Sequence, residues 1–111
     1  MTLEQCRDAC LATADACSEV AAACRAAPGA SGDMDRAAML EECARVCRTS
    51  ADVLGRLSDL SFVTCRVCAE LCMRCAAALD DAAADPRLAA CATACRKCAE
   101  VCFATSLRRA A

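Results

Sequence analysis

The chain has 111 residues, which is enough for one domain and too short for two. Its net charge is −2, and its Lys/Arg and Asp/Glu residues are interspersed, so it lacks the basic stripe of a nucleic-acid-binding protein. No apolar run is long enough to span a membrane, and we expect neither nucleic acid nor membrane as a partner. Fourteen residues are cysteine and none is histidine, tryptophan or tyrosine, so small side chains must fill most of the core.

Four helical segments follow one another along the chain. They are separated by a break rich in Pro and Gly at 27–33, a softer break at 55–61, and a third break at 81–86. Each segment has a length typical of a helix in a bundle. The expected helices cover about 3–26, 34–56, 59–80 and 86–107.

Two helix starts carry recognisable capping residues. The residues from Thr2 to Gln5 show the capping-box pattern. Asp85 is the expected N-cap of the last helix, with Pro86 at its first position. Helices of similar length joined by short connections predict an all-α fold, an antiparallel up-down-up-down four-helix bundle that forms one domain over residues 1–111.

The cysteines are spaced so that those of one helix share one face. Within each predicted helix, neighbouring cysteines are three, four or seven residues apart, which returns the side chain to the same side of the helix. We therefore expect the bundle core to be lined with thiols. The fourteen candidate metal ligands are Cys6, Cys10, Cys17, Cys24, Cys43, Cys47, Cys65, Cys68, Cys72, Cys75, Cys91, Cys95, Cys98 and Cys102.

An antiparallel arrangement also predicts which cysteines lie at the same level. The levels are counted from the end of the bundle that holds the N-terminus. The expected layers are Cys6 and Cys102; Cys10, Cys65 and Cys98, with Ser50; Cys47, Cys68 and Cys95, with Thr13; Cys17, Cys43, Cys72 and Cys91; Cys75, with Met39; and finally Cys24.

Several kinds of chemistry fit a thiol-lined core. Thiolates are soft ligands that select Cu(I), zinc or iron–sulfur clusters. The helical spacing from Cys65 to Cys75 differs from the loop spacing of a ferredoxin cluster site. Cu(I) accepts two or three thiolates that can bridge, so we expect on the order of 14 Cu(I) ions, about one per sulfur. A zinc or general thiophilic-metal buffer and a thiol–disulfide redox module remain alternatives.

Met39 is a further candidate ligand. It lies one turn before Cys43 on the same stripe, where its thioether could bind Cu(I) at the end of the core. The alternative is that Met39 is a plain core residue. Met34 and Met73 are expected to point away from the stripe.

The cysteine-bearing helices also carry motifs known from one protein family. The segments Cys65-Arg-Val-Cys-Ala-Glu-Leu-Cys and Cys91-Ala-Thr-Ala-Cys-Arg-Lys-Cys-Ala-Glu-Val-Cys combine C-x2-C and C-x3-C spacing. Nearly the whole chain resembles the four-helix-bundle copper storage proteins of bacteria. This resemblance implies multiple Cu(I) ions bound by cysteine thiolates along the core, and commonly a homotetramer. Members of that family usually carry histidine near the bundle mouth, and this chain has none.

Three expectations concern surface, location and activity. The third helix carries a second apolar stripe away from its cysteines, which favours a homo-oligomer. The first residues show neither the basic nor the apolar region of a secretory signal, so we expect a cytoplasmic protein. No catalytic constellation is visible, and we do not expect an enzyme. The stripe consists of Leu60, Val63, Val67, Leu71 and Ala78.

Overall fold

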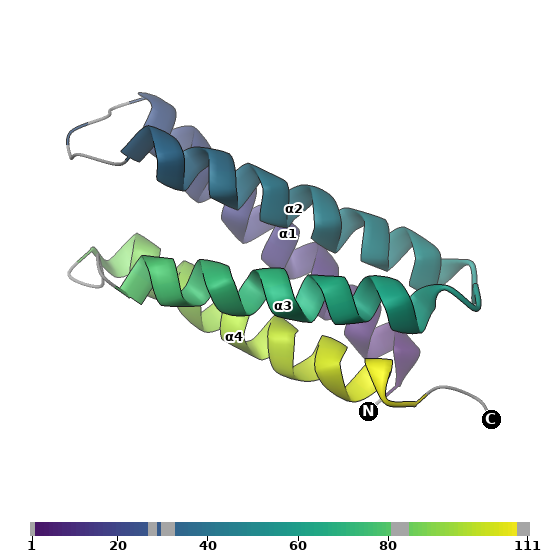
Figure 1. Cartoon of the computed structure of the whole chain (residues 1–111). Coiled ribbons are helices and arrows are strands. Elements are labelled where there is room, and N and C mark those ends of the chain that lie inside the picture. Colours follow the sequence, from purple (N-terminus) through teal and green to yellow (C-terminus); the bar gives the residue numbers. More distant parts are fainter. Residues whose placement is uncertain (1, 27–28, 30–32, 81–84, 109–111) are drawn as a thin grey trace.

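The computed structural model describes residues 2–26, 29, 33–80 and 85–108. These residues form four long helices, namely α1 (Leu3–Ala26), α2 (Asp33–Gly55), α3 (Ser61–Asp80) and α4 (Pro86–Ser106). Helices that are adjacent in the chain pack against each other, and α4 also packs against α1. The antiparallel up-down-up-down four-helix bundle that the sequence predicts is thereby confirmed (Figure 1).

The two ends of the bundle hold different segments. The terminus end holds the start of α1, the α2–α3 connection and the end of α4 (Figure 1). The loop end holds the last turns of α1 and α3 and the first turns of α2 and α4. The bundle is elongated, with extents of 49 × 19 × 17 Å. Among the described helices, none combines the length and the apolar character needed to cross a membrane.

The first and last helices begin at the caps that the sequence predicts. The backbone N–H of Thr2 donates to Oε1 of Gln5 at 2.8 Å, and the N–H of Gln5 donates to Oγ1 of Thr2 at 3.1 Å. Asp85 is the N-cap of α4, and its carboxylate accepts from the N–H of Arg87 at 2.9 Å. These bonds satisfy N–H groups that have no partner inside the helix.

The α2–α3 connection is a tight turn that starts with a Schellman motif. The N–H of Leu57 donates to the carbonyl of Leu54 at 3.1 Å, and the N–H of Ser58 donates to the carbonyl of Val53 at 3.3 Å. Leu57 takes a φ of 55°, in the left-handed region that favours glycine. The hydroxyl of Ser58 then accepts from the N–H of Leu60 at 3.1 Å. This turn occupies residues that the sequence assigns to the third helix, so α3 begins two residues later than predicted.

Buried alanines at seven-residue intervals let the helices of each hairpin approach closely. Seven residues make about two turns, so the alanines of one helix form a stripe beside its cysteines. The pairs α1–α2 and α3–α4 pack more extensively than α1–α4 and α2–α3. The bundle therefore consists of two tight hairpins whose facing sides carry the thiols. The alanines are Ala14 and Ala21; Ala37, Ala44 and Ala51; Ala69 and Ala76; and Ala92 and Ala99.

One buried hydroxyl ties each of the two contacts between the hairpins. Oγ of Ser50 on α2 donates to the carbonyl of Thr64 on α3 at 2.9 Å. Oγ1 of Thr13 on α1 donates to the carbonyl of Ala94 on α4 at 3.3 Å. Both hydroxyl residues are buried. Because each bond joins two specific residues, the bonds favour one position of the two hairpins relative to each other along the bundle axis.

Candidate metal centre

Cysteine thiols form the interior of the bundle along its length. Thirteen of the fourteen are buried, and only Cys24, near the end of α1, is partly exposed. All fourteen are free thiols. The buried polar residues in the described part of the chain are two threonines and a serine, with no charged side chain. Sulfur is therefore the main ligating group that the core offers.

Three thiols meet at the terminus end, and we call them the terminal triad. Sγ of Cys6 lies 4.0 Å from Sγ of Cys65 and 3.9 Å from Sγ of Cys102. All three sulfur atoms lie within 4.8 Å of one another and are buried. The triad thus brings together ligands from α1, α3 and α4.

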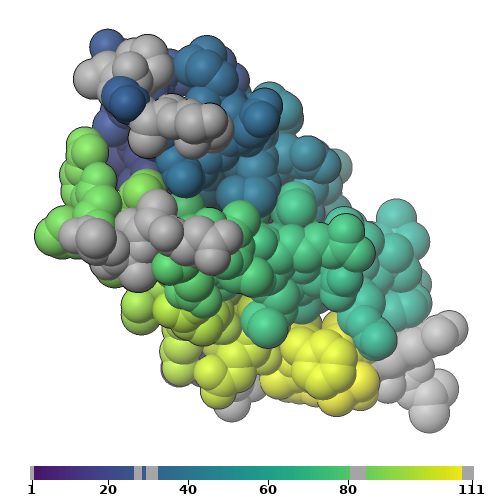
Figure 2. All heavy atoms as spheres, turned by 60° about the vertical axis from the view of Figure 1, so that its left-hand side comes forward, coloured from purple at the N-terminus to yellow at the C-terminus, as the bar shows by residue number. Residues whose placement is uncertain are grey.

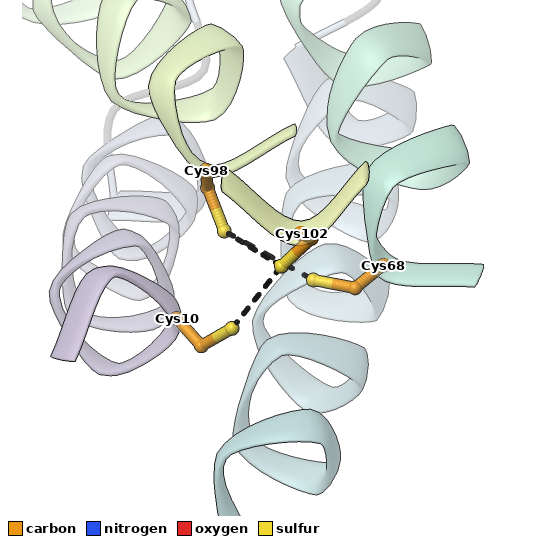
Figure 3. Close-up of side chains that lie close together, drawn as sticks. All are labelled: Cys10, Cys68, Cys98 and Cys102. Carbon is orange, nitrogen blue, oxygen red and sulfur yellow. Dashed lines mark hydrogen bonds between the residues drawn. The ribbon is translucent and has the colours of Figure 1, made fainter. Parts of the chain in front are cut away.

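A group of four thiols comes next along the core. Cys10, Cys68, Cys98 and Cys102 point toward one another from α1, α3 and α4 (Figure 3). Sγ of Cys10 lies 3.4 Å from Sγ of Cys102, and Sγ of Cys98 lies 3.9 Å from it. Sγ of Cys68 lies 4.0 Å from Sγ of Cys98. Because Cys102 also belongs to the terminal triad, the two groups share a sulfur atom.

A second group of four thiols overlaps the first. It consists of Cys47, Cys68, Cys72 and Cys98, so Cys68 and Cys98 belong to both groups. Sγ of Cys47 lies 3.6 Å from Sγ of Cys68 and 3.7 Å from Sγ of Cys72. Cys68 and Cys72, one turn apart on α3, have sulfur atoms 4.0 Å apart. A single helix therefore supplies two neighbouring ligands, as the spacing predicts.

The sulfur contacts continue toward the loop end. Cys17, Cys43 and Cys95 have Sγ atoms within 4.8 Å of one another. Sγ of Cys43 lies 3.7 Å from Sγ of Cys72, which joins this group to the central ones. Sγ of Cys91 lies 3.8 Å from Sγ of Cys17. Cys75 is also hydrogen-bonded to Cys43, so thirteen cysteines are linked into one column of sulfur, which leaves out Cys24.

The loop-end residues Cys75, Met39 and Cys24 are placed differently. The thiol of Cys75 donates to the carbonyl oxygen of Met39 at 3.9 Å, and Met39 is partly buried against the core. The predicted proximity of these two residues is confirmed, although the contact involves the backbone of Met39. Met34 and Met73 are exposed, as expected for residues off the cysteine stripe.

The predicted layers hold in part, and two cysteines are shifted in level. Cys95 was expected beside Cys47 and Cys68 but lies with Cys17 and Cys43. Cys6 meets Cys102, and Cys47 meets Cys68, as the sequence predicts. Cys65 was expected beside Cys10 but lies with Cys6 at the terminus end. The later start of α3, at Ser61, is consistent with the shift of Cys65, because it places this residue nearer to the beginning of the helix.

Burial and neighbouring thiols shift the pKa values of the cysteines. Hydrogen bonds to Cys43 and Cys47, together with burial, raise the pKa of the Cys72 thiol. The hydrogen bond from Cys102 lowers the pKa of Cys65, but the bond to Cys6 and burial outweigh it and raise that pKa to about 12. Cys68 has a pKa lowered to about 2 because it accepts hydrogen bonds from Cys10 and Cys102. Since a core without a buried cation disfavours thiolates, the direction that governs the column as a whole is upward.

Some residues of the site are outside the set of ligands that the sequence predicts. Thr105 is buried at the terminus end, and its hydroxyl lies beside the thiol of Cys6. Leu40, Leu79 and Leu88 are buried one turn beyond the last cysteines at the loop end. The signal that would have found all four is their spacing, since each lies three or four residues from a cysteine of its own helix.

A family model described as Csp, copper storage protein, matches residues 1–106. The chain belongs to the copper storage protein family. Comparisons with curated proteins and with solved structures found no significant match. The buried thiol groups are the part of this bundle that suits metal binding, so the fold and the copper storage family agree on a role in storing metal.

Proposed function

We propose that the protein stores multiple Cu(I) ions as thiolate complexes along the bundle core, with all fourteen cysteines as ligands and Met39 as a supplementary one. The observation that carries this proposal is the sharing of sulfur atoms between neighbouring groups, at Cys68, Cys98 and Cys102. A chain of bridging thiolates suits a soft monovalent ion, because each Cu(I) that replaces a thiol proton leaves the charge of the dry core unchanged.

Zinc is the second candidate, favoured by the two groups of four thiols. A tetrahedral site with Zn–S bonds of about 2.3 Å requires sulfur atoms roughly 3.8 Å apart, and distances around Cys47 of 3.6 and 3.7 Å match that spacing. However, the two groups share Cys68 and Cys98, so separate closed sites cannot form in both. Zinc therefore engages fewer of the thiols than Cu(I) does.

An anaerobic titration of the reduced protein with Cu(I) tests the storage role. We expect saturation at on the order of ten or more Cu(I) per chain, about one per sulfur, followed by metal analysis after gel filtration. A parallel sample receives equal Cu(I) and Zn(II), and we expect copper to displace zinc. Saturation at one or two Cu(I), or retention of zinc against copper, would overturn the proposal.

The same proposal treats the chain as a non-enzymatic, cytoplasmic store rather than a redox module. Reactive thiols are normally partly exposed in an electropositive setting, whereas thirteen of these thiols are buried. Mild oxidation that closed defined disulfides reversibly, in a protein that bound Cu(I) poorly, would favour the redox alternative instead.

We also propose that the chain forms a homo-oligomer through the outer face of α3. This face lies on the surface between α2 and α4 (Figure 2). Leu60, in the turn before α3, is 60% exposed, and Val63 and Val67 on α3 are 46 and 51% exposed, which leaves a row of aliphatic side chains in water. Light scattering after size exclusion should give a mass above that of the monomer, and Val67→Glu should return the protein to the monomer. A monomeric wild type at tens of micromolar would overturn this part of the proposal.

A further inference from the structure

Ion pairs and small side chains hold each hairpin of the bundle together. Arg25 of α1 pairs with Glu41 of α2 at 2.6 Å, and Arg96 of α4 pairs with Asp80 of α3 at 2.9 Å. A third ion pair also joins α1 to α2, so every ion pair between two of the described helices lies within one hairpin. The stripes of buried alanine pack the helices of each hairpin closely. Each hairpin is therefore a unit with its own internal contacts (Figure 1).

The two hairpins meet along a different kind of surface. We call this surface, where α1 meets α4 and α2 meets α3, the hairpin seam. The fully buried leucines lie toward the ends of the bundle, with Leu40 and Leu79 at the loop end and Leu54 at the terminus end. Between these ends the seam is made of thiols and of the hydroxyls of Thr13 and Ser50. A thiol is a small apolar group and a weak hydrogen-bond donor, so thiols hold the seam less firmly than leucines would.

Both sides of the seam are hollowed. On the α2–α3 side a groove of about 450 Å³ runs between Val46 and Leu71. On the α1–α4 side a groove of about 330 Å³ lies beside Val20 and reaches Cys91. Apolar contact is therefore less extensive between the hairpins than between the two helices of one hairpin.

The thiol groups cross this seam. Each of the four groups contains cysteines from both hairpins. The terminal triad joins Cys6 of the first hairpin to two cysteines of the second, and the group nearest the loop end joins Cys17 and Cys43 to Cys95. A metal ion in any of these groups bonds to both hairpins at once. An ion that binds only the closed bundle stabilises it against opening.

We propose that the apo bundle opens along the hairpin seam while each hairpin keeps its helices, and that bound metal closes the seam, so that the fold is a metal-dependent latch. The closing step rests on the proposed storage of Cu(I), whereas the opening of the apo protein does not. Such an opening costs less free energy than complete unfolding, because the contacts inside each hairpin persist. It exposes the thiols along the whole column together rather than those at one end.

Alkylation of the buried thiols by iodoacetamide tests the opening. The reduced apo Cys24→Ala protein is used under anaerobic conditions, so that every remaining thiol is buried. In molecules that carry a single label, peptide mass spectrometry should find the central residues Cys47 and Cys68 labelled as readily as Cys6. The rate should exceed by roughly tenfold or more the rate that complete unfolding allows, and it should rise less steeply with urea. Labels confined to one end of the bundle, or a rate and urea dependence equal to those of complete unfolding, would overturn the proposal.

A matched pair of substitutions tests the role of the seam. Thr13→Val removes the hydroxyl that joins α1 to α4. Thr93→Val removes an exposed hydroxyl that donates at 3.1 Å to the carbonyl of Ala89 in its own helix. We expect Thr13→Val to raise the alkylation rate by about three- to fivefold and Thr93→Val to leave it unchanged. Equal rates in the two variants would contradict opening at the seam.

Partial loading with Cu(I) tests the closing step. Two Cu(I) per chain engage about four to six thiols. Native mass spectrometry identifies the molecules that carry two ions and counts the alkyl groups on each. We expect the thiols that remain free in these molecules to react roughly tenfold more slowly than in the apo protein. Free thiols that keep their apo reactivity would overturn the latch and leave the storage function standing. A protein that binds little Cu(I) would overturn the storage function and the closing step, while the alkylation of the apo protein still decides whether the seam opens.

Discussion

The thiols of Cys10 and Cys102 lie 3.4 Å apart, the shortest of the measured thiol–thiol hydrogen bonds between helices in the described part of the chain. This contact joins α1 to α4, and Cys102 extends it to Cys6 and Cys98 at 3.9 Å each. Cys102 is therefore a junction between the terminal triad and the first group of four thiols. We therefore expect replacement of Cys102 to lower copper capacity and stability more than replacement of a cysteine with no sulfur neighbour.

We predict that Cys102→Ala lowers both copper capacity and stability. Its loss removes a ligand from two groups, so the saturating Cu(I) stoichiometry should fall by about one to two ions per chain. The vacated volume should lower the free energy of unfolding of the apo protein by on the order of 1 kcal/mol. Metal analysis after anaerobic saturation and urea unfolding measure the two effects.

Cys24→Ala is the matched control for this prediction. Cys24 is partly exposed and outside the linked column, so its loss should remove at most about one Cu(I) and leave the stability nearly unchanged. Equal losses of copper and stability in the two variants would contradict the junction role of Cys102.

Much of the core could be predicted from local spacing, because helical periodicity alone decides which side chains share a face. The direction of thirteen cysteines follows from gaps of three, four and seven residues, and Asp85 followed by Pro86 marks the start of α4. The position of each helix along the bundle axis does not follow from local spacing. It depends on the shape of the connections, and the later start of α3 is consistent with the shift of Cys65 from its predicted layer.

The parts that escaped prediction depend on three-dimensional surroundings. Cys24 shares the stripe of its helix, yet it lies so close to the end of α1 that it is not fully covered. Leu57 has a positive φ only because the chain has to turn there. The cavity beside Thr105 likewise depends on how the α2–α3 connection meets the ends of α1 and α4, which no periodicity reveals.

The hydrogen bond between Ser50 and Thr64 should contribute measurably to stability. Ser50→Ala removes a buried donor that links the two hairpins, and we expect the free energy of unfolding to fall by about 1 kcal/mol. Thr49→Ala is the control, because the hydroxyl of Thr49 is exposed and bonds only to the carbonyl of Arg45 in its own helix. Urea unfolding of the apo proteins measures both. If the two variants proved equally stable, the bond between hairpins would have no special role.

Leu57→Gly should stabilise the protein. Leu57 has a φ of 55° at the end of α2, where a side chain costs roughly 1 kcal/mol or more that glycine avoids. Its side chain is 76% exposed, so little packing is lost. We expect the free energy of unfolding to rise by about 0.5–1 kcal/mol.

Leu107→Gly provides the comparison at a similar exposed position. Leu107 ends α4 with a φ of −86°, a conformation that leucine adopts without strain. Glycine there should leave stability unchanged or lower it slightly, since it only adds freedom to the unfolded chain. A destabilised Leu57→Gly protein would show that the leucine side chain contributes more than its exposure indicates.

Stability of the apo protein should decrease at alkaline pH, whereas the copper-loaded protein should be far less sensitive. The pKa of Cys65 is raised from 9.0 to about 12, and the pKa of Cys72 is raised as well. A raised pKa means that the folded protein binds more protons than the unfolded chain above pH 9, so this stabilisation is complete below pH 9 and is lost as pH rises toward 12. We expect each such thiol to lower the free energy of unfolding of the apo protein by on the order of 1 kcal/mol at pH 10.

The chain has no tyrosine, and Lys97 is its only lysine, so cysteines dominate titration in this range. Anaerobic thermal unfolding between pH 7.5 and 10.5 measures the effect. In the loaded protein, copper has already replaced the thiol protons and the slope should largely vanish; an apo protein whose stability stayed constant to pH 10.5 would show that its thiols are not held protonated by burial.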